Sequence, residues 1–237
     1  MTRIAILETG HTRMKAVAAR RGGGYSRWFA DALDPIGAAW TAFDATAGDL
    51  PGPDHDFDGV IVTGSPASVH DREPWSEATA EWLARAVPTG LPILGVCYGH
   101  QLLAHALGAP VGPNPLGPSL GTFPVEVVED DPLFAGMDRP LRAHFVHYDA
   151  VLALPDGARL LATSPRCPIQ SFAVGDTVRA VQWHPEFDAE GARVAITQDA
   201  AKLADAGQDV ESLLAQVAVL PQREQVLVNF VRRFVEA

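Results

Sequence analysis

Residues 91–103 read Leu91-Pro92-Ile93-Leu94-Gly95-Val96-Cys97-Tyr98-Gly99-His100-Gln101-Leu102-Leu103. A short apolar run, typical of a buried strand, leads into Cys97, and a helical pattern begins directly after it. Glycines lie two residues before and two residues after the cysteine, where a sharp turn brings backbone segments close together. This is the form of a nucleophile elbow, with cysteine in place of serine. It would place the sulfur near a helix N-terminus, whose dipole favours the thiolate.

The rest of the first half surrounds this stretch with the pattern of a parallel sheet. Short apolar runs predict strands over 3–7, 40–43, 59–63 and 92–96, and amphipathic spacing predicts helices over 25–33, 75–87 and 98–107. Continuous apolar strands that alternate with helices indicate a parallel sheet covered on both faces. Active sites of such sheets lie at the carboxyl ends of the strands, where the turns at Gly64 and Cys97 both fall.

The second half is richer in strands. Apolar runs bounded by Pro, Gly and Asp predict strands over 123–128, 145–152, 159–163, 169–174 and 178–183. Helical patterns follow over 189–206, 211–219 and 222–235. We therefore predict a three-layer α/β fold, with a mostly parallel central sheet flanked by helices and a smaller antiparallel β extension. We expect residues 1–237 to form a single domain that includes the C-terminal helices, 189–237.

A lone cysteine at the end of a core strand is more often a buried structural residue than a nucleophile, so the elbow needs a base. One is found in the stretch Ala180-Val181-Gln182-Trp183-His184-Pro185-Glu186-Phe187. An apolar run ends at His184, and Pro185 stiffens the turn. Glu186 can reach the imidazole and fix its tautomer. His-Pro-Glu alone is a weak signal, but its pairing with the Cys97 elbow predicts a Cys-His-Glu catalytic triad.

The two motifs together resemble the class I glutamine amidotransferase family, most closely the amidotransferase domain of GMP synthase and its free-standing relatives. Other matching segments are Val62-Thr63-Gly64-Ser65-Pro66, Val111-Gly112-Pro113-Asn114-Pro115 to Gly121, and His147-Tyr148-Asp149-Ala150-Val151. The likeness spans nearly the whole chain. It implies the flavodoxin-like fold of that family.

The resemblance also implies a role for each site residue. Cys97 attacks the γ-carboxamide of glutamine or a related γ-glutamyl amide, His184 transfers protons, and Glu186 orients His184. Backbone N–H groups of Tyr98 and of Gly64 or Ser65 form the oxyanion hole. The remaining substrate contacts come from Gln101 and from the backbone around Val146, His147, Tyr148 and Asp149. A γ-glutamyl thioester forms, and water releases glutamate.

Three positions depart from the family pattern. Ser65 replaces the second glycine of a Gly-Gly-Pro loop, which leaves the required backbone N–H in place. Ser119 lies where free-standing relatives carry a glutamate, and Tyr148 lies where a glycine is common. The last two changes bear on substrate identity.

Three functions fit these residues. The first is a glutamine amidotransferase subunit or free-standing glutaminase that releases ammonia, either to a separate synthetase or to water. The second is a γ-glutamyl hydrolase or peptidase that acts on a small γ-glutamyl compound with the same triad. The third is a catalytically silent binding or regulatory module, for which Cys97 would be unreactive.

Composition excludes several other classes. The chain has 237 residues, 47% of them hydrophobic, with a net charge of −11 and a pI near 5.1. This acidic balance argues against a nucleic-acid partner. There is no apolar run of membrane-spanning length, and two cysteines make no disulfide framework, so we expect a cytoplasmic protein. We expect no cofactor and no metal. The histidines lack the convergent ligands of a metal site. Asp54, His55, Asp56 and Asp58 resemble metal ligands in type, but we expect them to form a solvated loop before a strand.

Overall fold

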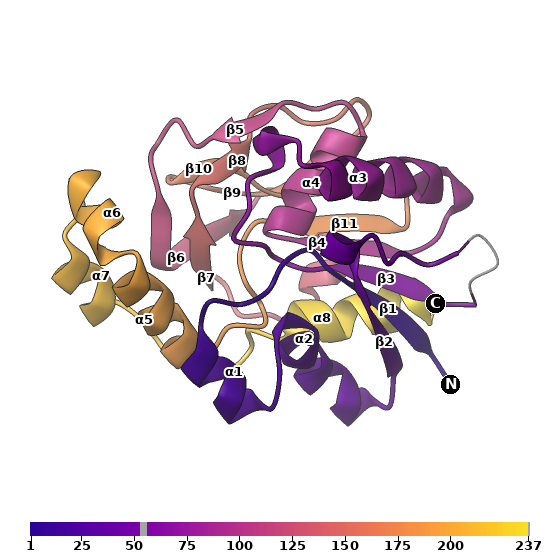
Figure 1. Ribbon diagram of the computed structural model, residues 1–237, viewed down its shortest axis with the longest axis horizontal. Helices are drawn as coiled ribbons and strands as arrows, with labels where there is room; N and C mark the ends of the chain where they lie inside the picture. Colours follow the sequence, from indigo (N-terminus) through magenta and orange to yellow (C-terminus); the bar gives the residue numbers. More distant parts are fainter. Residues whose placement is uncertain (53–55, 237) are drawn as a thin grey trace.

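The computed structural model describes residues 1–52 and 56–236 (Figure 1). Within them, nine strands form one sheet in the order β2-β1-β3-β4-β11-β10-β9-β6-β7. These strands are β1 (Arg3–Glu8), β2 (Ala39–Asp44), β3 (Gly59–Val62), β4 (Ile93–Val96), β6 (Ser119–Val127), β7 (Leu141–His147), β9 (Arg159–Ser164), β10 (Cys167–Val174) and β11 (Val178–Val181). The short strands β5 (Val111–Pro113) and β8 (Asp149–Val151) form a second, antiparallel pair.

The strand directions divide the large sheet into two parts. Strands β2, β1, β3, β4 and β11 are parallel to one another, and β10, β9, β6 and β7 continue the sheet from β11 in antiparallel fashion. This arrangement confirms the predicted fold class of a mostly parallel sheet with an antiparallel extension.

Helices cover both faces of the parallel part (Figure 1). On one face lie α2 (Tyr25–Leu33) and α8 (Gln225–Phe230), and on the other lie α3 (Pro74–Ala86) and α4 (Tyr98–Ala106). α1 (Lys15–Arg21) packs against α2, whereas α5 (Ala189–Gln198), α6 (Ala200–Asp205) and α7 (Val210–Ala215) lie beside the antiparallel strands β6 and β7 (Figure 1). Alternate residues of β1 serve opposite faces, as the period of a strand requires. Ile4 and Ile6 join the core cluster that contains residues of α2 and α8, whereas Ala5 and Leu7 join the cluster under α3 and α4.

Some predicted elements are divided in the structure, and two divisions shape the site. The single strand predicted over 145–152 is instead β7 and β8, separated by Tyr148, because β8 leaves the large sheet to pair with β5. The helix predicted over 189–206 is broken at Asp199, whose side chain is almost wholly buried. Farther along, the helix predicted over 222–235 ends in a π-helical turn, Val231–Val235.

The remaining structural predictions have mixed outcomes. No described helix is long and apolar enough to cross a membrane. Both cysteines are free thiols. The cytoplasmic location and the single domain over 1–237 stay predictions. Asp54 and His55, expected in a solvated loop, lie outside the described residues.

Candidate active site

Three neighbouring strands deliver the predicted site residues to one edge of the sheet. β4 lies between β3 and β11, and all three are parallel, so their carboxyl ends meet at the same edge. Gly64 and Ser65 follow β3, Cys97 follows β4, and His184 follows β11. The order of the strands therefore brings together residues that are up to 120 positions apart in sequence.

Cys97 occupies a strained turn of the kind predicted. Its φ of 52° and ψ of −101° lie where residues other than glycine are uncommon. Its N–H donates to the Val181 carbonyl at 2.9 Å, which anchors the turn to β11. A Cβ on Gly95 would lie 2.5 Å from the Gly99 oxygen, and one on Gly99 would lie 2.3 Å from the Val62 oxygen. The flanking glycines are thus required by close backbone approach.

His184 lies beside the thiol and is backed by a carboxylate. Its Nδ1 is 2.7 Å from Oε1 of the fully buried Glu186. Its imidazole is within hydrogen-bonding reach of Cys97 and stacks on Phe187 with ring centroids 4.2 Å apart. A Cβ on Gly64 would lie 2.9 Å from His184 Cε1 and 3.6 Å from Cys97 Cβ, so Gly64 packs against both side chains and a larger residue would collide with His184.

Electrostatics favour the protonated form of His184. Burial by itself lowers the pKa of His184, but the charges of Cys97 and Glu186 and its hydrogen bonds to both outweigh burial. The net result is a His184 pKa well above its ordinary value. The arrangement can therefore hold a thiolate beside an imidazolium, the reactive form of a cysteine nucleophile.

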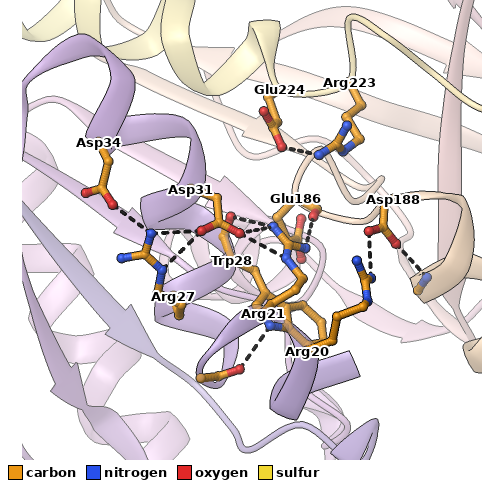
Figure 2. Close-up of polar contacts among 12 residues, drawn as sticks. Arg20, Arg21, Arg27, Trp28, Asp31, Asp34, Glu186, Asp188, Arg223 and Glu224 are labelled. Atoms are coloured by element: carbon orange, nitrogen blue, oxygen red, sulfur yellow. Dashed lines mark hydrogen bonds and ion pairs between the residues drawn. The ribbon is translucent and has the colours of Figure 1, made fainter. Parts of the chain in front are cut away.

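A buried arginine holds the backbone of Glu186 in place (Figure 2). Nη1 of Arg21, at the end of α1, donates to the Glu186 carbonyl oxygen at 2.7 Å. Its Nε and Nη2 donate to one Asp31 oxygen at 3.0 and 2.6 Å, and the guanidinium lies 5.3 Å from the Trp28 ring centroid. Sequence reasoning missed this contact, because the basic pair Arg20-Arg21 does not by itself indicate a partner.

The site opens into a small cavity of about 110 Å³. Predicted residues that line it are Ser65, Cys97, Tyr98, Gln101, Val146, His147, Tyr148, Asp149 and His184. Glu186 lies behind His184. Residues that sequence reasoning missed complete the wall, and they include Arg13, Met14, Tyr25, Ser68, Phe187, Gln198 and Asp199.

Buried polar contacts fix the predicted substrate-binding side of the cavity. Gln101 Nε2 donates to the Asp149 carbonyl and to Gln182 Oε1, both at 3.1 Å. The Asp149 carboxylate accepts from the Ser68 hydroxyl at 2.6 Å. Burial lowers the pKa of His147 to about 4, so this ring is neutral and its Nδ1 can donate to the Asp149 carbonyl at 2.9 Å.

The side chains of Tyr98 and Ser119 have surroundings that the sequence did not predict. The Tyr98 phenol bonds the Ser76 hydroxyl at 2.6 Å, and burial raises its pKa to about 12. Its backbone N–H is the part of Tyr98 at the site, because it begins α4 and has no intrahelical acceptor. Ser119 lies buried in β6, opposite His147.

The sequence model described as glutamine amidotransferase class-I matches residues 22–203, which is most of the chain. The chain belongs to the class I glutamine amidotransferase family. It is accordingly an amidohydrolase, and the predicted resemblance is confirmed.

Individual relatives divide into two groups. GMP synthase [glutamine-hydrolyzing] of Aeropyrum pernix is 41% identical over 128 residues, which are 54% of this chain and 24% of that protein. This chain thus spans about a quarter of the length of that synthase. Gamma-glutamyl peptidase 3 of Arabidopsis thaliana is 28% identical over 176 residues, 71% of each chain. A Thermotoga maritima glutamine amidotransferase has the same fold, with a TM-score of 0.73 and 22% identity over 100% of this chain and 99% of the other.

Proposed function

We propose that this amidotransferase hydrolyses the γ-carboxamide of glutamine, or a related γ-glutamyl amide, with Cys97, His184 and Glu186 as its catalytic triad. The observation that carries the proposal is the strained Cys97 elbow beside a His184 imidazole that Glu186 holds at 2.7 Å. Strain of this kind persists where the fold needs one side chain in a fixed place. A thiol, a base and a buried orienting carboxylate form the set that nucleophilic acyl transfer requires.

The first half of the reaction forms a thioester. The Cys97 sulfur attacks the γ-carbonyl carbon, and the thiol proton resides on His184. The S–C bond forms as the oxygen becomes an oxyanion, which the N–H groups of Tyr98 and of Gly64 or Ser65 stabilise. The carbonyl then re-forms, the C–N bond breaks, and His184 gives its proton to the departing nitrogen as ammonia or an amine.

The second half returns the free enzyme. Water loses a proton to His184 and attacks the thioester carbon. The S–C bond breaks, glutamate leaves, and the proton on His184 restores the Cys97 pair. Throughout both halves, Glu186 keeps Nδ1 occupied so that the other ring nitrogen faces the sulfur.

The side of the cavity made by Gln101 and residues 146–149 suits the α-amino and α-carboxylate groups of the substrate. Gln101 Nε2 makes the two hydrogen bonds to the protein described above, and Oε1 is the acceptor that remains for a substrate ammonium. The Val146 carbonyl is 3.7 Å from the Cys97 sulfur and is therefore within reach of bound substrate.

Two substrate classes follow, and each has support. The likeness to GMP synthase supports glutamine, with ammonia passed to a separate synthetase partner. The likeness to a gamma-glutamyl peptidase over 71% of both chains supports a small γ-glutamyl compound. Arg13 and Asp199, the charged cavity residues that the sequence did not predict, support the same class.

The test is glutamate release from glutamine and from a panel of γ-glutamyl amides and dipeptides, with Cys97→Ala as the control. Release that depends on Cys97 supports the proposed enzyme, and the preferred substrate selects between the two classes. No release from any compound would support the third reading, a silent module.

A further inference from the structure

We infer that Arg13 forms a leaving-group subsite that binds a carboxylate, so that the substrates of this enzyme are γ-glutamyl amino acids or peptides. The inference rests on the proposed function, since it concerns the part of the substrate beyond the scissile amide. Nothing in the sequence motifs points to Arg13, which lies in the loop between β1 and α1.

Arg13 is the one permanently charged cation among the described residues that line the cavity. Its side chain is 58% exposed, and its ion pair with the Asp199 carboxylate, at 3.5 Å, involves one of its three nitrogens. The guanidinium therefore keeps most of its donors for an incoming oxyanion. Its backbone is held in place, because Gln198 Nε2 donates to the Arg13 carbonyl at 3.2 Å.

The local charge balance favours an anion. Asp199 is 7% exposed and carries one negative charge. Arg13 and Lys202 both approach it, the latter at 3.8 Å, so the three groups together leave one net positive charge. A substrate carboxylate that binds the free edge of Arg13 restores neutrality.

The position of His184 places the Arg13 charge on the side of the cavity that the leaving group occupies. The departing nitrogen must lie near His184, which protonates it. His184 stacks on Phe187, which belongs with Met14 and Tyr25 to one packed cluster. Met14 adjoins Arg13, and Tyr25 and Phe187 line the cavity with it. A group attached to the departing nitrogen therefore runs along this apolar wall toward Arg13, away from the Gln101 side.

The closing experiment compares three substrates that share the γ-glutamyl group. γ-Glutamylglycine carries a carboxylate on its leaving group, γ-glutamylethylamide has a neutral leaving group of similar size, and glutamine has none. We expect the wild-type enzyme to prefer γ-glutamylglycine. Arg13→Gln should lower kcat/KM for γ-glutamylglycine about 10- to 100-fold and change the other two by less than about threefold. Arg13→Lys should retain more activity on γ-glutamylglycine than Arg13→Gln, because lysine keeps the positive charge but lacks the planar set of guanidinium N–H donors.

Arg85→Gln is the matched control, since Arg85 is an exposed arginine on α3 with a single weak ion pair. An equal loss of kcat/KM for all three substrates in Arg13→Gln would overturn the inference, because Arg13 would then not distinguish one leaving group from another. Unchanged kinetics in Arg13→Gln would overturn it too. So would a wild-type enzyme that hydrolyses glutamine but not γ-glutamylglycine, and the proposed function would survive that result. If no substrate releases glutamate, the proposed function fails and the subsite fails with it.

Discussion

Glu186→Gln tests how the buried carboxylate supports catalysis. The substitution keeps the shape of the side chain and removes its charge. A neutral amide can still accept a bond from Nδ1, but a charge-assisted bond is about twice as strong as a neutral one. Hydrogen bonds to charged groups contribute about 1.5–3 kcal/mol, so kcat/KM should fall about 10- to 150-fold. Because Glu186 is fully buried, solvent cannot compensate for the loss.

The same variant should also change the pH profile. The charges of Cys97 and Glu186 outweigh burial and raise the pKa of His184, so activity that needs protonated His184 is lost as the pH rises through that raised value. Removal of the Glu186 charge lowers this pKa, and the alkaline limb should move to lower pH by about one to three pH units. The assay is glutamate release between pH 5 and 10, with Glu190→Gln, an exposed carboxylate on α5, as control. An unchanged rate and an unchanged alkaline limb would refute the role of Glu186.

Two further substitutions examine the supports of the site. Arg21→Met should lower kcat more than it raises KM and should shift the alkaline limb of the pH profile, because Arg21 bonds the Glu186 carbonyl and touches no substrate group. Recovery of activity in Arg21→Lys would show that Arg21 positions Glu186, and thermal melting would show whether either variant has lost its fold. Gly99→Ala places a Cβ 2.3 Å from the Val62 oxygen and should destabilise the fold by about 2 kcal/mol or more, measured by urea unfolding. Gly52→Ala is its control, because a Cβ there meets no atom of the described residues within 4 Å, and equal stability of the two variants would contradict the close approach.

The sequence predicted the parts of the site that local motifs encode. The apolar run, Cys97 and its two flanking glycines lie in one short stretch of sequence, and the strand–turn–helix geometry follows from that stretch. The His184-Pro185-Glu186 turn is equally local, and the structure places His184 Nδ1 2.7 Å from Glu186 Oε1. The parallel order of β3, β4 and β11 then brings the two motifs together.

The rest of the cavity could not be predicted because it depends on contacts between distant segments. Arg13 and Asp199 are 186 residues apart and meet because Val17 of α1 and Ala195 of α5 belong to one packed cluster. Helical periodicity continued through Asp199, whereas the structure breaks the helix there and buries the carboxylate at the cavity. Alternation likewise continued through Tyr148, where the chain passes from one sheet to the other.

The central claim, that Cys97 is the nucleophile, is tested most directly by labelling with a thiol-reactive glutamine analogue, followed by peptide mass spectrometry. The cavity makes Cys97 accessible to a glutamine-shaped reagent, whereas burial raises the pKa of Cys167 to about 11 and keeps it a neutral thiol. We predict one adduct per chain, on Cys97, which excess glutamine or a γ-glutamyl dipeptide prevents and Cys97→Ser abolishes. An adduct on Cys167, or an unmodified Cys97 after prolonged exposure, would contradict the account.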